Sequence, residues 1–316
     1  MLDVPSENLL RAIFHTLAYS DVFDYPLTAS EIYRYLTATG VSAAEVVRAL
    51  ANENLFARVG EYYTLHGRAQ IIETRKRRGV VASRLWPKAA RYGRIIASLP
   101  FVRMVAVTGS LAMNNTDEGQ DVDYMIVTEP QHLWTCRALS LFIARFAKLE
   151  GISLCPNYLV TLNALELNER SLYVAHELAQ MIPLSGMEFY SELRRRNAWT
   201  DEYLPNAGLA PELPQGVKQA QEYSVMRRVL EALSRLPFAN WFETWEMHRK
   251  IARLSREQSA SFESYFSSEV CKGHVDRHGE TVVTALANRL ANVSVPDPTD
   301  ESISVKEMPA RSEQAR

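Results

Sequence analysis

The sequence has few cysteines and no long apolar run. Its three cysteines, Cys136, Cys155 and Cys271, are odd in number and far apart, so they provide no disulfide framework. The first residues, MLDVPSENLL, lack the basic and apolar segments of a signal peptide. The most apolar helical candidate, Leu133 to Leu149, contains three basic residues and is too charged to span a bilayer. We therefore expect a cytoplasmic protein without membrane contact.

A strong charge imbalance is also missing. The chain carries 35 Lys and Arg against 37 Asp and Glu, a net charge of −2, so no global field draws it to nucleic acid. With 316 residues, of which 47% are apolar, it is long enough for two or three folded domains. Residues 296–316 contain too few apolar side chains to form a core, and we expect a disordered tail there.

The most informative segment runs from Val105 to Val127 and reads as an apolar strand, a Gly-Ser turn, a polar loop and a second strand. Asp121 and Asp123 are two residues apart, so they point to the same side of the second strand. Carboxylates held this close repel unless a cation lies between them, and Mg²⁺ binds through one or two carboxylates plus substrate phosphates. Gly109 and Ser110 offer backbone N–H groups and a hydroxyl to phosphate oxygens. The segment predicts a metal and nucleotide site.

This pattern resembles the DNA polymerase beta-like nucleotidyltransferase superfamily, over roughly a quarter of the chain, the scale of one small domain. The resemblance implies that Asp121 and Asp123 bind Mg²⁺ or Mn²⁺, and that Gly109 and Ser110 bind the phosphates of a nucleoside triphosphate. It also implies transfer of a nucleoside monophosphate to an acceptor, which the sequence does not identify as a small molecule, a protein or a nucleic acid. The alternative is a surface hairpin whose aspartates are merely solvated.

The superfamily pattern includes a third carboxylate on a later strand, which takes the proton of the attacking hydroxyl. The next strand of this sequence, residues 153–161, has Asn157 where the acid is expected. Asparagine can orient a hydroxyl but cannot act as a base at neutral pH. Glu166 and Glu177 are alternative sources of the charge. Two further alternatives are an acceptor that needs no strong base and a domain that binds nucleotide without turning it over.

Residues 1–70 resemble a winged helix-turn-helix domain. Two capping-box patterns, Thr28 to Glu31 and Ser42 to Glu45, each precede an apolar stripe, and two short strands around residues 55–65 form the wing. The outward face of the third helix carries a single basic residue, Arg48, so we expect only weak DNA contact. An alternative function for the whole chain is therefore a catalytically weak, nucleotide-sensing DNA-binding regulator.

The rest of the chain predicts an α+β protein with three further parts. Residues 71–99 form a basic helical connector, residues 100–185 the nucleotidyltransferase core, and residues 186–295 a helical domain without strands. We expect the core to be a small mixed sheet with helices on one side. The basic run of the connector is either a solvated face or a surface over phosphates or nucleic acid.

Near the end of the helical domain, Lys272 is a candidate contact for the triphosphate, with His274 and Arg277 as alternatives. Cys271, His274 and His278 also have the spacing of soft metal ligands. A closed zinc site would require a distant fourth ligand, so zinc is the weaker hypothesis for this segment.

Overall fold

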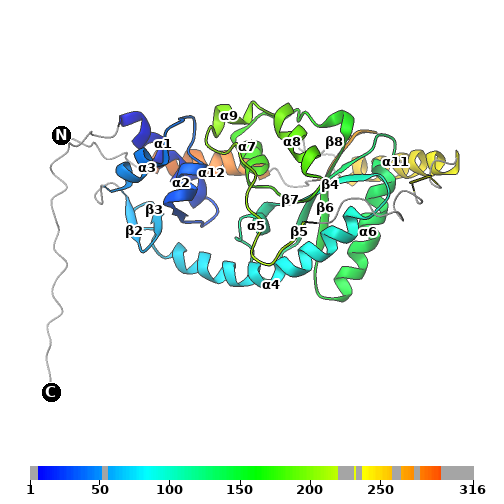
Figure 1. The fold of residues 1–316 in the computed structure, drawn as a ribbon, viewed down its shortest axis with the longest axis horizontal. Helices are drawn as coiled ribbons and strands as arrows, with labels where there is room; N and C mark the ends of the chain where they lie inside the picture. The colour runs from blue at the N-terminus through cyan, green and yellow to red at the C-terminus, as the bar shows by residue number, and fades with distance from the viewer. Residues whose placement is uncertain are drawn as a thin grey trace, which may run out of the picture.

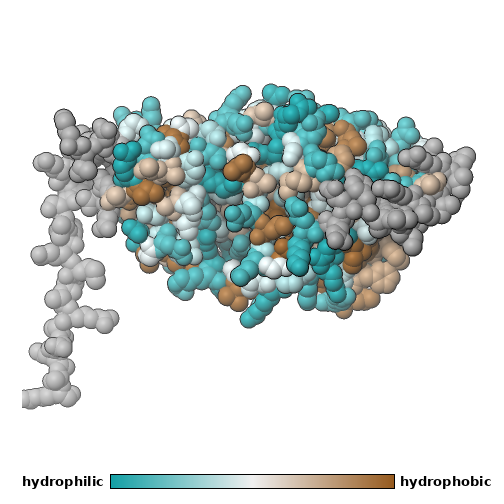
Figure 2. Space-filling model, in the orientation of Figure 1, coloured by the Kyte–Doolittle hydropathy of each residue, from teal (hydrophilic) through white to brown (hydrophobic). Residues whose placement is uncertain are grey.

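The computed structural model describes residues 6–51, 56–219, 231–232, 237–257, 265–273 and 278–292. Its architecture is mixed α+β, as the sequence predicts. Figure 1 shows a small helical module (blue) at one end and a larger sheet-containing body, with the long helix α4 (Ile71–Ala97) running beneath both. On the face shown in Figure 2, hydrophobic residues form separate patches among hydrophilic ones. Within the described residues no helix is long and apolar enough to cross a membrane.

The N-terminal module has the helices and the wing that the sequence predicts. Its elements are α1 (Glu7–Asp21), β1 (Leu27–Thr28), α2 (Ala29–Arg34), α3 (Ala43–Leu50), β2 (Ala57–Val59) and β3 (Tyr62–Thr64). Both predicted capping boxes are confirmed, since Thr28 and Ser42 each exchange hydrogen bonds with the glutamate three residues later. The strand β1 was missed by the sequence analysis. It pairs with β3 and makes the wing three-stranded, in the order β1-β3-β2.

The last described helix, α12 (His278–Asn292), packs on this module. Val282 and Leu286 of α12 are buried in the same hydrophobic cluster as α1. Arg289 also pairs with Asp21 at the end of α1, with an Nε to Oδ2 distance of 2.5 Å. The end of the described chain is therefore tied to its beginning.

The larger body is built on one mixed sheet with the strand order β7-β4-β5-β6-β9-β8. The pairs β4·β5 and β4·β7 are antiparallel, whereas β5·β6 is parallel and is connected by α6 (Leu133–Leu149). The strands are β4 (Val102–Thr108), β5 (Val122–Thr128), β6 (Leu154–Thr161), β7 (Ile182–Ser185), β8 (Tyr265–Phe266) and β9 (Val270–Lys272).

Helices cover both faces of this sheet, so the prediction of helices on one side was wrong. Val105, Val107 and Ile126 face one hydrophobic cluster, which includes residues of α4 and α6. Met104, Met125 and Val127 alternate with them and face a second cluster, which includes residues of α7 (Leu172–Gln180) and α8 (Met187–Arg196). The predicted connector thus supplies one layer of the core. The remaining described helices are α5 (Gly109–Ala112), η1 (Leu162–Ala164), α9 (Thr200–Tyr203) and α11 (Pro237–Glu257).

Residues 186–295 do not consist of helices alone, which corrects a second prediction. Strands β8 and β9 follow α11 and extend the sheet beside β6. Each is two or three residues long, too short to give an alternating pattern in the sequence. Most of residues 216–236, within the predicted helical domain, lie outside the described residues, as does the tail of residues 296–316.

Candidate active site

The predicted site residues meet at one end of the sheet, on the face covered by α7. In the antiparallel pair β4·β5, Thr108 is the register partner of Asp123. In the parallel pair β5·β6, Asp123 is the register partner of Cys155. Because side chains alternate along a strand, Asp123 points to the same face as Met125 and Val127, which pack toward α7. Pairing between neighbouring strands is therefore enough to bring these side chains together.

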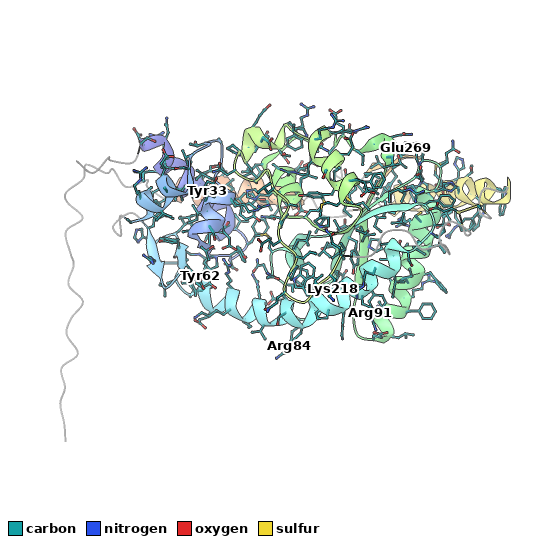
Figure 3. All side chains as sticks on the ribbon, in the orientation of Figure 1. Tyr33, Tyr62, Arg84, Arg91, Lys218 and Glu269 are labelled. Atoms are coloured by element: carbon teal, nitrogen blue, oxygen red, sulfur yellow. The ribbon has the colours of Figure 1, made fainter. Side chains whose placement is uncertain are left out.

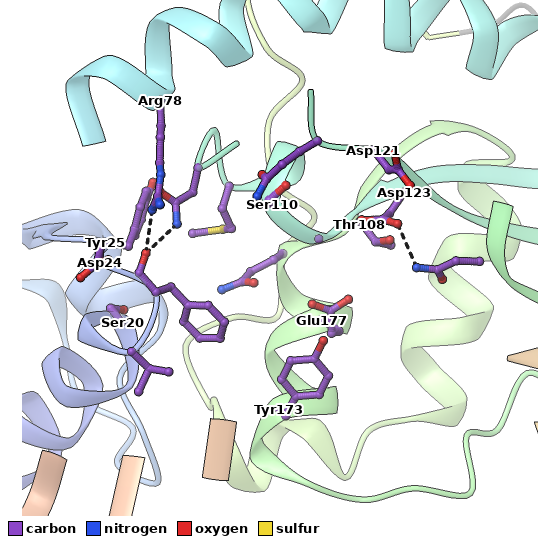
Figure 4. A pocket seen from close by; sticks show the side chains of 18 of the residues that line it. Ser20, Asp24, Tyr25, Arg78, Thr108, Ser110, Asp121, Asp123, Tyr173 and Glu177 are labelled. Carbon is purple, nitrogen blue, oxygen red and sulfur yellow. Dashed lines mark hydrogen bonds between the residues drawn. The ribbon is translucent and has the colours of Figure 1, made fainter. Parts of the chain in front are cut away.

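These residues line a cavity of about 600 Å³. One wall holds the aspartate pair, Gly109 and Ser110, and another is formed by Glu177 and Tyr173 of α7. The opposite wall comes from the N-terminal module, namely residues 19–25 at the end of α1, together with Arg78 of α4. Figure 4 shows these walls facing one another across the cavity. The volume is in the range of small-molecule sites.

Asp123 is held partly buried, and its surroundings shift its titration. Burial raises the pKa of Asp123 to about 6, against the opposing effect of the hydrogen bond from Asn157 and with the help of the charge on Asp121. Asn157 Nδ2 donates to Asp123 Oδ1 at 3.0 Å. Asp121 lies one residue before β5 and is exposed. The pair therefore combines one buried and one solvent-accessible carboxylate on the same side of the chain.

Gly109 fits against Asp123 in a way that no other residue can. Its φ is +65°, in the left-handed region that favours glycine, and a Cβ at this position would lie 2.7 Å from Asp123 Oδ2. The Gly-Ser turn is thus packed directly on the buried aspartate. This contact gives a physical reason for the glycine in the predicted motif.

Asn157 lies where the sequence analysis expected it, on the side of the sheet that holds the aspartates. The register between β5 and β6 shifts at this point, so that Asn157 is the extra residue of a bulge between Pro156 and Tyr158. Its side chain is 8% exposed and its amide is bonded to Asp123. The predicted geometry is confirmed, whereas a catalytic role for Asn157 stays a prediction.

Of the two glutamates considered as the missing acid, only Glu177 lines the cavity. Burial, followed by the charge on Asp123, raises the pKa of Glu177 to about 7, while the ammonium of Lys272 acts in the opposite direction. Glu166 is instead largely exposed and pairs with Arg170 in the next helical turn, with an O to N distance of 3.1 Å. Glu177 therefore brings a carboxyl group from helix α7 to the cavity that Asp121 and Asp123 line.

Lys272 is not part of the lining of the cavity that holds the aspartate pair. It sits on β9 and its Nζ contacts Glu169 Oε2 at 2.6 Å, and both line a small adjoining pocket with Asn157 and Glu177. Its predicted contact with the triphosphate is not tested by this placement. Of the other residues named for that segment, Cys271 is buried in the core, and His274 and Arg277 lie outside the described residues.

Cys155 and Arg78 also line the cavity, and neither was among the predicted site residues. Burial, reinforced by the charge of Asp123, raises the pKa of Cys155 to about 12, so its thiol is neutral at physiological pH. Strand register could have located Cys155, two residues before Asn157. Nothing in the sequence separates Arg78 from the neighbouring basic residues, because its position depends on the packing of α4.

The lining residues suit Mg²⁺ bound together with a nucleotide. Within the described residues there is no group of three or more His, Cys, Asp or Glu side chains that could hold a metal ion by itself. Mg²⁺ retains several waters and is commonly held by one or two carboxylates plus substrate phosphates. Asp121 and Asp123 provide such an incomplete set of ligands, which a triphosphate would complete.

Comparisons with protein-family models, with curated proteins and with solved structures found no match for this chain.

Proposed function

We propose that the protein is a Mg²⁺-dependent nucleotidyltransferase that moves a nucleoside monophosphate from a nucleoside triphosphate to an acceptor. The observation that carries this proposal is the arrangement of Asp121, Asp123 and Glu177 around one cavity, with Gly109 in contact with Asp123. Mn²⁺ is an alternative cofactor with similar ligand preferences. The cavity offers negative charge for metal ions at one end and a carboxyl group with a near-neutral pKa on a separate wall.

In the proposed reaction an acceptor oxygen forms a bond to the α-phosphorus, and the bond from that phosphorus to the bridging oxygen breaks and releases pyrophosphate. Asp121 and Asp123 hold Mg²⁺, which when bound neutralises charge on the triphosphate. Glu177 takes the proton of the acceptor hydroxyl, since a base whose pKa is near 7 suits transfer at neutral pH. Asn157 keeps the Asp123 carboxylate in place through its amide.

Mg²⁺ together with a nucleoside triphosphate is expected to raise the melting temperature of the wild-type protein. The ligand binds only the folded state, and at 100 times its Kd it stabilises by about 2.7 kcal/mol. The double variant Asp121→Asn/Asp123→Asn should keep its fold and lose this shift. Differential scanning fluorimetry with each of the four nucleotides, with and without Mg²⁺ or Mn²⁺, measures both. A wild type that shows no shift at millimolar concentrations contradicts the proposal.

The DNA-binding regulator is the second candidate, and the ion pairs of α4 weigh against it. Arg75 is bonded to Glu31, and Arg77 and Arg78 are both bonded to Asp117. These arginines neutralise acids of the protein itself. Figure 3 shows Arg84 and Arg91 on the outer side of α4, where Arg91 pairs with Glu150.

We expect the full-length protein to bind duplex DNA weakly and with little sequence preference. The outward face of α3 has a single basic residue, Arg48. Because few phosphates would be contacted, the affinity for DNA should fall only gradually as the salt concentration rises. Fluorescence anisotropy on random and palindromic duplexes over a range of salt concentrations provides the measurement. Tight, sequence-selective binding at physiological salt would favour the regulator instead.

A further inference from the structure

Arg78 is the only cationic residue among the described residues that line the cavity, whose acids are Asp24, Asp121, Asp123 and Glu177. Asp24 is already paired with Arg68 outside the lining, at 2.5 Å. In Figure 4 Arg78 extends from α4 at the end of the cavity opposite Asp121 and Asp123, and the acceptors of its hydrogen bonds are other residues.

The guanidinium of Arg78 is fixed by three protein acceptors on one side. Its Nε donates to Asp117 Oδ2 at 2.9 Å, and its Nη1 donates to the Phe23 carbonyl at 3.0 Å and to Asn115 Oδ1 at 3.2 Å. Asn115 Nδ2 donates to the same Phe23 carbonyl at 3.0 Å. The N-terminal module and the loop before Asp121 thus jointly fix the guanidinium that Arg78 extends from α4.

The remaining nitrogen of Arg78, Nη2, donates to no protein atom in the described part of the chain. The side chain is 17% exposed and is part of the lining of the cavity. A guanidinium fixed through Nε and Nη1 presents its Nη2 hydrogens in a set direction, and phosphate oxygens are a preferred partner for such donors.

Groups that suit a metal ion and phosphates follow one another along the cavity. Figure 4 shows Asp121 and Asp123 at one end, Ser110 between, and Arg78 at the opposite end. If the α-phosphate lies at the aspartates, as the proposed transfer requires, the chain of phosphates passes Gly109 and Ser110 toward Arg78. The terminal phosphate is then the group that meets the guanidinium.

We propose that Arg78 binds the terminal phosphate of the nucleoside triphosphate, and that the N-terminal module holds it in place through the Phe23 carbonyl. This inference rests on the proposed nucleotidyltransferase function. It assigns to the N-terminal module a part in substrate selection, namely the preference for a triphosphate over a diphosphate. A contact with the terminal phosphate alone would not affect binding of a diphosphate.

The test compares Mg²⁺ complexes of ATP and ADP, or of GTP and GDP if GTP stabilises the wild type more, by isothermal titration calorimetry on the full-length protein without acceptor. Loss of a charge-assisted contact typically weakens binding on the order of 10- to 100-fold. Arg78→Gln should weaken triphosphate binding by that factor and leave diphosphate binding unchanged. Inorganic tripolyphosphate and pyrophosphate provide the same comparison with ligands that lack a nucleoside.

Arg77→Gln is the matched control, because Arg77 bonds the same Asp117 but does not line the cavity. It should leave both affinities unchanged. Asp117→Asn weakens the contact between Arg78 and the loop before Asp121 but retains the guanidinium. This variant should therefore keep the preference for the triphosphate. If Arg78→Gln does not fold, Arg78→Lys serves in its place and should retain a reduced preference.

The inference is overturned if Arg78→Gln weakens triphosphate and diphosphate equally, or weakens neither. If Asp117→Asn loses the preference for the triphosphate as fully as Arg78→Gln does, Arg78 only anchors the loop before Asp121. If the wild type binds neither a Mg²⁺ nucleotide nor tripolyphosphate, the proposed function is refuted as well. If Arg78→Gln still binds the triphosphate in preference to the diphosphate, only the role of Arg78 is refuted.

Discussion

Gly109→Ala is expected to abolish Mg²⁺-dependent nucleotide binding and transfer while the protein stays folded. A methyl group at this position would lie 2.7 Å from Asp123 Oδ2, closer than carbon and oxygen can approach. The obstacle is the end of a side chain, so relief comes from moving the carboxylate rather than the backbone. A displacement of about 1 Å in a reacting group can cost on the order of 10²-fold in rate. Melting temperature, nucleotide titration and pyrophosphate release measure the three consequences.

Gly119→Ala is the control for backbone strain. Gly119 also has a positive φ, +82°, and lies in the loop that leads to Asp121, but nothing is within 4 Å of a Cβ there. Both substitutions carry the same type of conformational cost, about 1 kcal/mol. Only Gly109→Ala adds the contact with Asp123. Equal loss of nucleotide binding in the two variants would mean that loop conformation, and not the position of Asp123, controls the site.

The placement of the polar side chains at one end of the sheet could be predicted because it depends on short-range rules. Alternation along a strand places Asp121 and Asp123 on one side, and the next strand in sequence is also the next in the sheet, which brings Asn157 to Asp123. The capping boxes follow from hydrogen bonds within four residues. In each case a local pattern determines the contact.

The remaining parts of the site depend on packing between distant segments. The wall formed by residues 19–25 and Arg78 exists because α4 crosses from the N-terminal module to the sheet, and no local pattern encodes that crossing. Helices on both faces were not expected, because residues 71–99 were assigned to a connector, whereas Trp86 and Tyr92 of α4 pack in the core against the sheet. Strands β8 and β9 were too short to be recognised.

Glu177→Gln is expected to reduce turnover on the order of 10²- to 10⁴-fold, the usual contribution of a general base, with little change in nucleotide affinity. In the wild type, kcat/KM should rise with pH and level off above about 7, as Glu177 ionises. The variant should lack this rise. Glu166→Gln is the control, since Glu166 is exposed and bonded only to Arg170 among described residues, and it should behave as wild type.

A stability measurement tests the same assignment without substrate. The pKa of Glu177 is raised from 4.5 to about 7, so between these values the native state binds more protons than the unfolded state. Its contribution therefore favours folding at low pH and is lost as pH rises toward 7, by about 1–3 kcal/mol. Glu177→Gln removes this loss and should be more stable than wild type at pH 8 in metal-free buffer. Urea unfolding at pH 5 and pH 8 provides the comparison.

Asn157→Asp separates the two possible positions for the base. The substitution replaces the amide that donates to Asp123 Oδ1 at 3.0 Å with a second carboxyl group, so in the metal-free protein it should raise the pKa of Asp123 further. Because Glu177 already supplies a base, we expect little gain in turnover and a greater requirement for Mg²⁺. A gain of 10²-fold or more in Asn157→Asp, with wild-type turnover in Glu177→Gln, would place the missing base on β6 and leave Glu177 a structural acid.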